Sequence, residues 1–322
     1  IDELIYKDEF LAMLMEEGKV DNPDDLKTVS LDDYHKAPWP VERTLDFKNR
    51  IAVIYASGEI VMGKGGDQVI GSEGISKAIR KARLDDKVKA IVLRVNSPGG
   101  SALASEIILR EAELAKKAKP FIVSMGDYAA SGGYYISCKA DHIFADKTTL
   151  TGSIGVFGLI PNAQKAMNEI LGVNIDEVST NKNSDYFGIM KPLSPYQREV
   201  MQRGVNDIYQ TFIHHVAEGR SMTPEYVDSI GQGRVWSGAD ALGLGLVDAY
   251  GNLEDALAYA AAKIGIENYK LDVLPERKDP FEQILSDLRG NAKIEAEQLL
   301  GPYGKYAKGI KHLADGERVK AR

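Results

Sequence analysis

Short apolar runs alternate with amphipathic segments through the middle of this chain. Four runs have the length and composition of buried strands: residues 51–55, 90–95, 121–125 and 142–145. Between them, the spacing of apolar positions predicts helices at 74–84 and 102–116 and a short helix after Ser131. Strands that alternate with helices in this way predict βαβ units and a sheet covered by helices on both faces.

The flanking segments are more varied. We expect a helix at residues 8–17, followed by a proline-interrupted polar linker at 21–44. Beyond residue 158 the pattern predicts a helix at 162–171, a strand at 175–178 and a long helix at 194–220. A last helix is predicted at 252–264, because Asn252 is a favourable N-cap and Gly265 a favourable end.

We therefore expect three parts: the end of a preceding repeat plus a linker at 1–45, the main domain at 46–272, and a peripheral helix and tail at 273–322. A faint internal repeat motivates the first part. Ile-Asp at residues 1–2 resembles Val-Asp at 247–248, which lies 246 positions later. Leu-Ala at 11–12 matches Leu-Ala at 257–258 with the same displacement. The repeat predicts that the chain begins with the last helix of a related unit.

Composition narrows the function classes. The chain has 322 residues, 44% hydrophobic and 27% charged, which is typical of a globular protein with a core. Its formal net charge of −7 argues against nucleic-acid binding. A single cysteine, Cys138, excludes an intramolecular disulfide and a cysteine-based zinc site. No apolar run reaches 18 residues, and no metal-ligand spacing occurs, so we expect no metal and no cofactor.

Three glycine-bearing loops follow predicted strands. They read Asn-Ser-Pro-Gly-Gly at 96–100, Ala-Ala-Ser-Gly-Gly-Tyr-Tyr at 129–135 and Thr-Gly-Ser-Ile-Gly-Val at 151–156. Ligand sites in α/β sheets gather outside the carboxyl ends of strands, so the three loops are expected to converge. Each loop alone is equally compatible with packing or with anion binding.

Together the loops favour one acyl-transfer site. Ser131 opens a helix and has only small neighbours, so its hydroxyl is the candidate nucleophile. The N–H of Gly132 and an N–H from Gly99 or Gly100 are the candidate oxyanion donors. Ser153 is expected to lie close to Ser131 and to orient a base.

These motifs, with Gly-Arg-Val-Trp at 233–236 and Gly-Leu-Val-Asp at 245–248, resemble the signal peptide peptidase A family, also called protease IV. The resemblance covers residues 51–264 and implies the crotonase/Clp-like α/β fold of repeated ββα units with a helical C-terminal region. It implies a serine endopeptidase that degrades signal peptides after their release from precursors, with a Ser/Lys dyad. It also implies a homo-oligomer, tetrameric in the full-length form, at the bacterial inner membrane and facing the periplasm, anchored by a segment outside this chain.

The base is where the sequence departs from the family. Short members carry the lysine in a motif like Lys-Ser-Gly-x-x-Lys-Asp, and here Ser184 falls at the lysine's place. Long members are tandem duplications with the lysine in the first half and the nucleophile in the second. We therefore expect this chain to be the nucleophile-bearing half, with its base elsewhere. Lys182, two residues away, is the competing candidate, although a solvated loop lysine is the simpler interpretation.

Other mechanisms stay open at this stage. His142 lies in a predicted strand, and the adjacent His214 and His215 lie on different faces of a helix, so a Ser-His-Asp triad is disfavoured. Cys138 reads as a buried thiol. The alternatives to a peptidase are a crotonase-type acyl-CoA enzyme, which needs no nucleophile, and a non-catalytic assembly domain that completes a neighbour's site.

Overall fold

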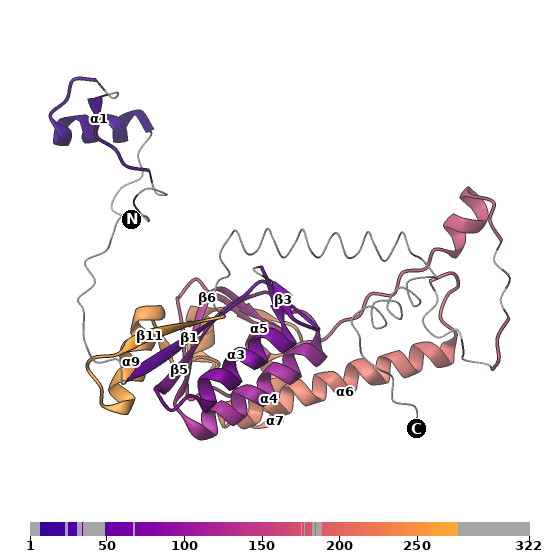
Figure 1. Cartoon of the computed structure of the whole chain (residues 1–322). Coiled ribbons are helices and arrows are strands. Elements are labelled where there is room, and N and C mark those ends of the chain that lie inside the picture. Colours follow the sequence, from indigo (N-terminus) through magenta and orange to yellow (C-terminus); the bar gives the residue numbers. More distant parts are fainter. Residues whose placement is uncertain are drawn as a thin grey trace, which may run out of the picture. The chain divides into compact units, whose positions relative to one another are not determined.

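The computed structural model describes residues 7–22, 25–30, 34, 49–66, 68–174, 176, 178–181, 184 and 189–275. The chain forms two compact units, Ile1–Leu45 and Asp46–Arg322. The second unit contains the sheet and is coloured violet to orange in Figure 1.

The core of the second unit is a sheet with the strand order β10-β7-β6-β5-β1-β11, in which every neighbouring pair is parallel. In that order the strands are Ala249–Tyr250, His142–Ala145, Phe121–Ala130, Val88–Ser97, Arg50–Ser57 and Lys270–Leu274. Two short strands extend the same sheet, because β8 (Leu150–Gly152) pairs with the end of β6 and β9 (Val235–Ser237) pairs with β8.

Helices cover both faces of this sheet. Along β1, Ala52 and Ile54 point to one face and pack with α3 (Ser72–Leu84) and α4 (Ala102–Ala118). Ile51 and Val53 point to the other face and pack with α9 (Leu253–Ile264). Strands buried on both faces need continuous apolar runs, which is why the sequence pattern predicts them well. The α/β fold class expected from the sequence is confirmed.

The remaining elements are short, apart from one helix. A small second sheet contains β2 (Glu59–Val61), β3 (Gly65–Gly66) and β4 (Val69–Gly71). The others are α5 (Gly132–Tyr135), the π-helix η2 (Ala166–Ile170), α6 (Pro195–Arg220), α7 (Pro224–Ile230) and α8 (Gly238–Gly243). Strands of two or three residues carry no readable periodicity, so the sequence analysis missed β2, β3, β4, β8, β9 and β10.

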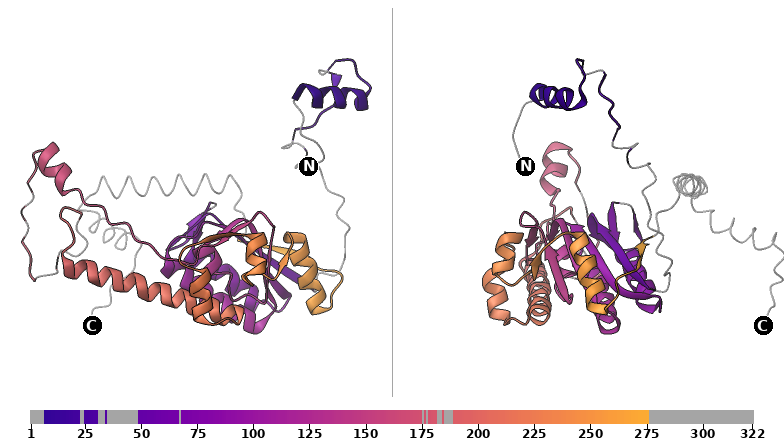
Figure 2. Two further views of the ribbon diagram at one scale, coloured as in Figure 1. Left: turned by 180° about the vertical axis from the view of Figure 1, so that it is seen from behind. Right: turned by 90° about the vertical axis from the view of Figure 1, so that its left-hand side faces the viewer.

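Figure 2 shows α6 extending well past the sheet. Its buried apolar residues, among them Phe212 and Val216, lie in the C-terminal half of the helix, next to the sheet. The predicted start is confirmed: Ser194 forms a capping box with Gln197, and Pro195 occupies the first turn. Of the strand predicted at 175–178, residues 175 and 177 lie outside the described residues, and 176 and 178 are not in a strand. Of the C-terminal part predicted at 273–322, residues 276–322 also lie outside them.

The first unit contains α1 (Lys7–Gly18), which has the same length as α9 and lies 246 positions before it. The helices also end alike. Lys19 has a φ of 52° and Gly265, 246 positions later, a φ of 67°. Lys19 N–H donates to the carbonyl of Glu16 at 3.2 Å, and Gly265 N–H donates to that of Ala262 at 3.1 Å.

The next hydrogen bond of each helix end also corresponds. Val20 N–H donates to the carbonyl of Met15 at 3.0 Å, and Ile266 N–H donates to that of Ala261 at 3.1 Å. Both ends are therefore the same left-handed termination, although one uses lysine where glycine is favoured. Such an end is common among helices, so the repeat hypothesis, under which α1 is the counterpart of α9 in a preceding unit, stays a prediction.

A buried ion pair joins α3 to α4. The Glu111 carboxylate, 3% exposed, accepts from Arg80 Nη2 at 2.9 Å and from Arg83 Nε at 2.8 Å. We expect Glu111→Ala to lower the free energy of unfolding by about 2 kcal/mol, because two guanidinium groups lose a partly buried partner. Chemical denaturation measures this. The control is Arg110→Ala on the same helix, whose pair with Glu113 is solvent-exposed and whose loss is expected to cost less than about 0.5 kcal/mol. Equal losses in the two variants would contradict the prediction.

Candidate active site

Ser131 follows the last residue of β6 and begins α5. Its backbone has φ 52° and ψ −118°, a conformation that L-residues rarely adopt. Two hydrogen bonds hold this turn: Ser131 N–H donates to the carbonyl of Gly152, and Tyr135 N–H donates to the carbonyl of Ser131, both at 2.9 Å. The turn changes the chain from strand to helix in one residue, and the serine side chain is half-buried rather than enclosed.

Ser153 lies next to Ser131 because the strands that precede them are paired. In the ladder between β6 and β8, Ala130 is opposite Gly152, and each serine is the following residue. Ser153 also has a positive φ, 48°, and its N–H donates to the carbonyl of Arg234 at 2.7 Å. The structure therefore brings the two predicted serines together.

The glycine pair at 99–100 packs directly against the Ser131 turn. A Cβ added to Gly99, which has a φ of +104°, would lie 2.6 Å from Gly132 N and 2.8 Å from Ser131 Cβ. A Cβ added to Gly132 would lie 3.2 Å from Gly100 N. A Cβ at Gly99 would collide with backbone and one at Gly132 would lie 2.7 Å from Ser105 Oγ, so the close approach of the two loops requires glycine.

The backbone N–H groups of the three glycines are in different situations. Gly99 N–H donates to Ser97 Oγ at 3.1 Å. Gly100 N–H and Gly132 N–H have no hydrogen-bond acceptor among the described residues. Two unpaired amide donors therefore lie beside Ser131, which is the arrangement that stabilises an oxyanion. The sequence did not distinguish Gly99 from Gly100.

The hydroxyl groups of the two serines are also unpaired. Within the described ranges, neither Ser131 Oγ nor Ser153 Oγ makes a hydrogen bond, to a lysine or to any other group. Lys182, the competing base, lies outside the described residues. Ser184, at the place of the family's lysine, is exposed, and its hydroxyl donates to the carbonyl of Asn181 at 3.0 Å.

None of the described histidines is hydrogen-bonded to Ser131. His142 is opposite Ile122 near the start of β6, so the strand places it more than about 20 Å from the serine. Its ring stacks on that of Tyr259, with 4.2 Å between ring centroids. His214 Nδ1 is hydrogen-bonded to the carbonyl of Gln210, and His215 Nε2 to Glu106. His35 and His312 lie outside the described residues.

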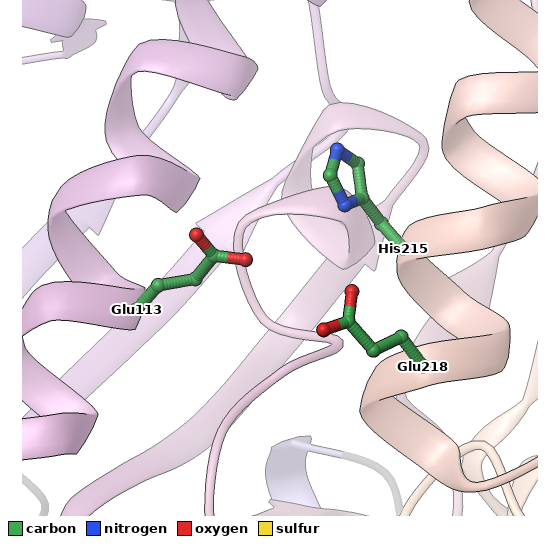
Figure 3. Close-up of side chains that lie close together, drawn as sticks. All are labelled: Glu113, His215 and Glu218. Atoms are coloured by element: carbon green, nitrogen blue, oxygen red, sulfur yellow. The ribbon is translucent and has the colours of Figure 1, made fainter.

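A polar cluster that the sequence analysis missed lies between α4 and α6 (Figure 3). One ligand-type atom from each of Glu113, His215 and Glu218 lies within 4.8 Å of the others. Lys139 Nζ contacts both carboxylates at 2.6 Å, so an ammonium group already bridges them and offsets one of their two negative charges. Hydrogen bonding and charge from Lys139 lower the pKa of Glu218. Glu113 and Lys139 are far in sequence from His215 and Glu218, and no motif links the two pairs, so no sequence signal indicated the cluster.

Comparisons with known proteins give the class. A family model described as "Peptidase family S49" matches residues 113–267. The chain is 41% identical over 287 residues to "Protease 4" of Salmonella typhi, covering 88% of this chain and 46% of that protein. It is 38% identical over 299 residues to "Serine protease SPPA, chloroplastic" of Arabidopsis thaliana, covering 90% and 43% respectively. The chain thus spans about half the length of these curated relatives.

A shorter relative matches over most of its own length. "Putative protease slr0021" of Synechocystis sp. is 33% identical over 258 residues, which is 80% of this chain and 88% of that protein. The chain belongs to peptidase family S49, the signal peptide peptidase A family, as the sequence motifs indicated.

A solved structure of a ClpP1 point mutant from Listeria monocytogenes aligns with a TM-score of 0.43 and 16% identity, over 64% of this chain and 94% of that one.

In the described part of the chain, none of the helices combines the length and the apolar composition needed to cross a bilayer.

Cys138 lies in the turn after α5 and is 0% exposed. Burial raises the pKa of its thiol to about 12, and the reactive thiolate is therefore scarce at neutral pH. We expect no alkylation of the folded chain by iodoacetamide at pH 8 and complete alkylation in denaturant, measured by intact mass. Rapid alkylation of the folded chain would contradict the buried position.

Proposed function

We propose that this chain is the nucleophile-bearing part of a serine peptidase. Ser131 Oγ attacks a peptide carbonyl, and the N–H groups of Gly100 and Gly132 hold the oxyanion. The observation that carries the proposal is their convergence: a strained serine turn, in which Gly132 N–H is unpaired, lies against a loop that presents the unpaired N–H of Gly100.

The reaction balances with one external base. A neutral amine takes the Ser131 proton as the Oγ–C bond forms, then returns a proton to the leaving nitrogen as the C–N bond breaks. The acyl-enzyme ester is hydrolysed by water, whose proton passes to the same amine and then to Ser131 Oγ as the Oγ–C bond breaks. Ser153 orients the amine, because its unpaired hydroxyl lies beside Ser131 at the end of the paired strand.

We assign the amine to a lysine outside this chain. Ser184 stands where the short family members carry their lysine. The chain spans about half of its long relatives, and α1 repeats the geometry of α9, as expected for one half of a tandem duplication. The assembly in which the halves meet is a homo-oligomer, tetrameric in the full-length protein, attached to the bacterial inner membrane on its periplasmic side.

The proposed substrates are signal peptides after their release from precursors. The segment that leaves Ser153 exposes large apolar side chains, with Phe157 92% and Leu159 88% exposed. An apolar peptide segment gains free energy by covering such side chains. The relatives named protease are consistent with a peptide substrate.

Fluorophosphonate labelling with amine rescue tests the nucleophile. If the base lies outside this chain, we expect slow labelling alone and at least about tenfold faster labelling with propylamine at pH 9, since the free amine replaces a general base. Mass spectrometry locates the adduct at Ser131, and Ser131→Ala serves as the control.

Two results would overturn parts of this proposal. Absence of any Ser131 adduct, with and without amine, would contradict the nucleophile and favour an acyl-CoA enzyme or an assembly domain. Fast amine-independent labelling that Lys182→Ala abolishes would place the base inside the chain.

Peptide choice tests the substrate class. With propylamine present, we expect a peptide with an apolar core of signal-sequence type to be cleaved at least about tenfold faster than one of equal length with two core leucines replaced by aspartate. Burial of each leucine side chain contributes about 2 kcal/mol, which the charged peptide forfeits. Chromatographic product analysis measures both rates, and equal rates would argue against signal peptides.

A further inference from the structure

The strand that carries Ser131 is irregular shortly before the serine. Val95 of β5 is opposite Met125 of β6, but the next pair is Ser97 with Ala129. Between these pairs β5 has one residue, Asn96, and β6 has three, at 126–128. This is a bulge in β6, and it lies three residues before the nucleophile.

The bulge is also where β6 changes its partner. Residues Ile122–Ser124 pair with β7, whereas Tyr128–Ala130 pair with β8. The ladder that places Ser153 beside Ser131 begins at Tyr128, the last residue of the bulge. The position of the nucleophile therefore depends on how the bulge is held.

Asn96 occupies the gap in β5 that faces the bulge. Its Oδ1 accepts a hydrogen bond from Tyr128 N–H at 3.0 Å. Its side chain also packs against Gly126, where an added Cβ would lie 3.0 Å from both Asn96 Cγ and Oδ1. The side-chain amide thus takes the place of the missing backbone acceptor of the ladder.

Other side chains hold the same bulge by donating to its carbonyls. Arg94 donates to the carbonyl of Met125, Thr149 to that of Gly126 at 2.8 Å, and Thr151 to that of Ala129 at 2.7 Å. Among the described residues, Asn96 is the side chain that accepts from a bulge N–H. Asn96 is also two residues from Pro98 and three from Gly99, so one residue contacts the nucleophile's strand and begins the oxyanion loop.

We propose that Asn96 is a positioning residue, which sets the register between the oxyanion loop and the strand that ends at Ser131. The expected effect of Asn96 on the rate of Ser131 labelling rests on the proposed serine chemistry. Its expected effect on the position of Ser131 does not. The acceptor that reaches Tyr128 N–H lies at the δ position of residue 96. Aspartate supplies the same acceptor, whereas alanine supplies none.

The test compares Asn96→Ala, Asn96→Asp and a matched control, Asn252→Ala. In the parent chain, Asn252 Oδ1 also accepts hydrogen bonds from backbone N–H groups, those of Glu254 and Asp255 at the start of α9. The control variant loses this oxygen. Both alanine variants lose the same chemical group, but α9 packs on the sheet face formed by Ile51 and Val53 rather than against the serine turn.

We expect Asn96→Ala to slow amine-rescued fluorophosphonate labelling of Ser131 about ten- to hundredfold, because small misplacements at a reacting centre have effects of this size. Asn96→Asp is expected to stay within about threefold of the parent, and Asn252→Ala to label at the parent's rate. Hydrogen exchange at the Tyr128 amide is expected to accelerate in Asn96→Ala only. A folded Asn96→Ala chain that labels at the parent's rate would overturn the proposal.

Crystal structures of the parent and Asn96→Ala keep the inference separate from the proposed function. Failure of the parent to label would contradict the serine chemistry alone. A Ser131 Oγ that moves by less than about 0.5 Å relative to Gly100 N in Asn96→Ala would contradict the positioning role, whatever the chemistry.

Discussion

The structure of the site depends on a contact between backbones. Gly99 and Gly132 approach so closely that a Cβ on the first would lie 2.6 Å from the nitrogen of the second. This contact brings the loop after β5 against the turn after β6 and leaves the Gly100 and Gly132 amides beside one hydroxyl. Because no side chain fits between the loops, the contact itself is formed by main chain.

Local signals allowed the sequence to predict much of this arrangement. Asn252 and Gly265 define the two ends of α9 through contacts within a few residues, so both ends could be predicted from the sequence. Ser131, Ser153 and the glycine pair were readable as loops after buried strands. In contrast, β6 runs five residues beyond its predicted end at 125, because its last part, Gly-Asp-Tyr-Ala-Ala, lacks strand periodicity and is held by tertiary contacts.

What the sequence could not give depends on partners distant in the chain. Ser97 Oγ accepts a hydrogen bond from Gly99 N–H. Gly99 therefore shapes the loop, whereas Gly100 presents the unpaired donor. The bulge opposite Asn96 could not be predicted from the sequence, because a pairing register is a property of two strands together. The cluster of Glu113, Lys139 and Glu218 likewise forms only when α4 and α6 pack together.

The two serine turns also explain why the site is built on a parallel sheet. Ser131 and Ser153 both have positive φ, and each such conformation costs about 1–3 kcal/mol. They persist because the strands before them are paired, and because Gly152 and Arg234 carbonyls accept their N–H groups. A flexible loop would relax both turns. The apolar strands buried on both faces thus stabilise a strained backbone and hold the two serine residues at neighbouring positions, with neither hydroxyl hydrogen-bonded within the described part of the chain.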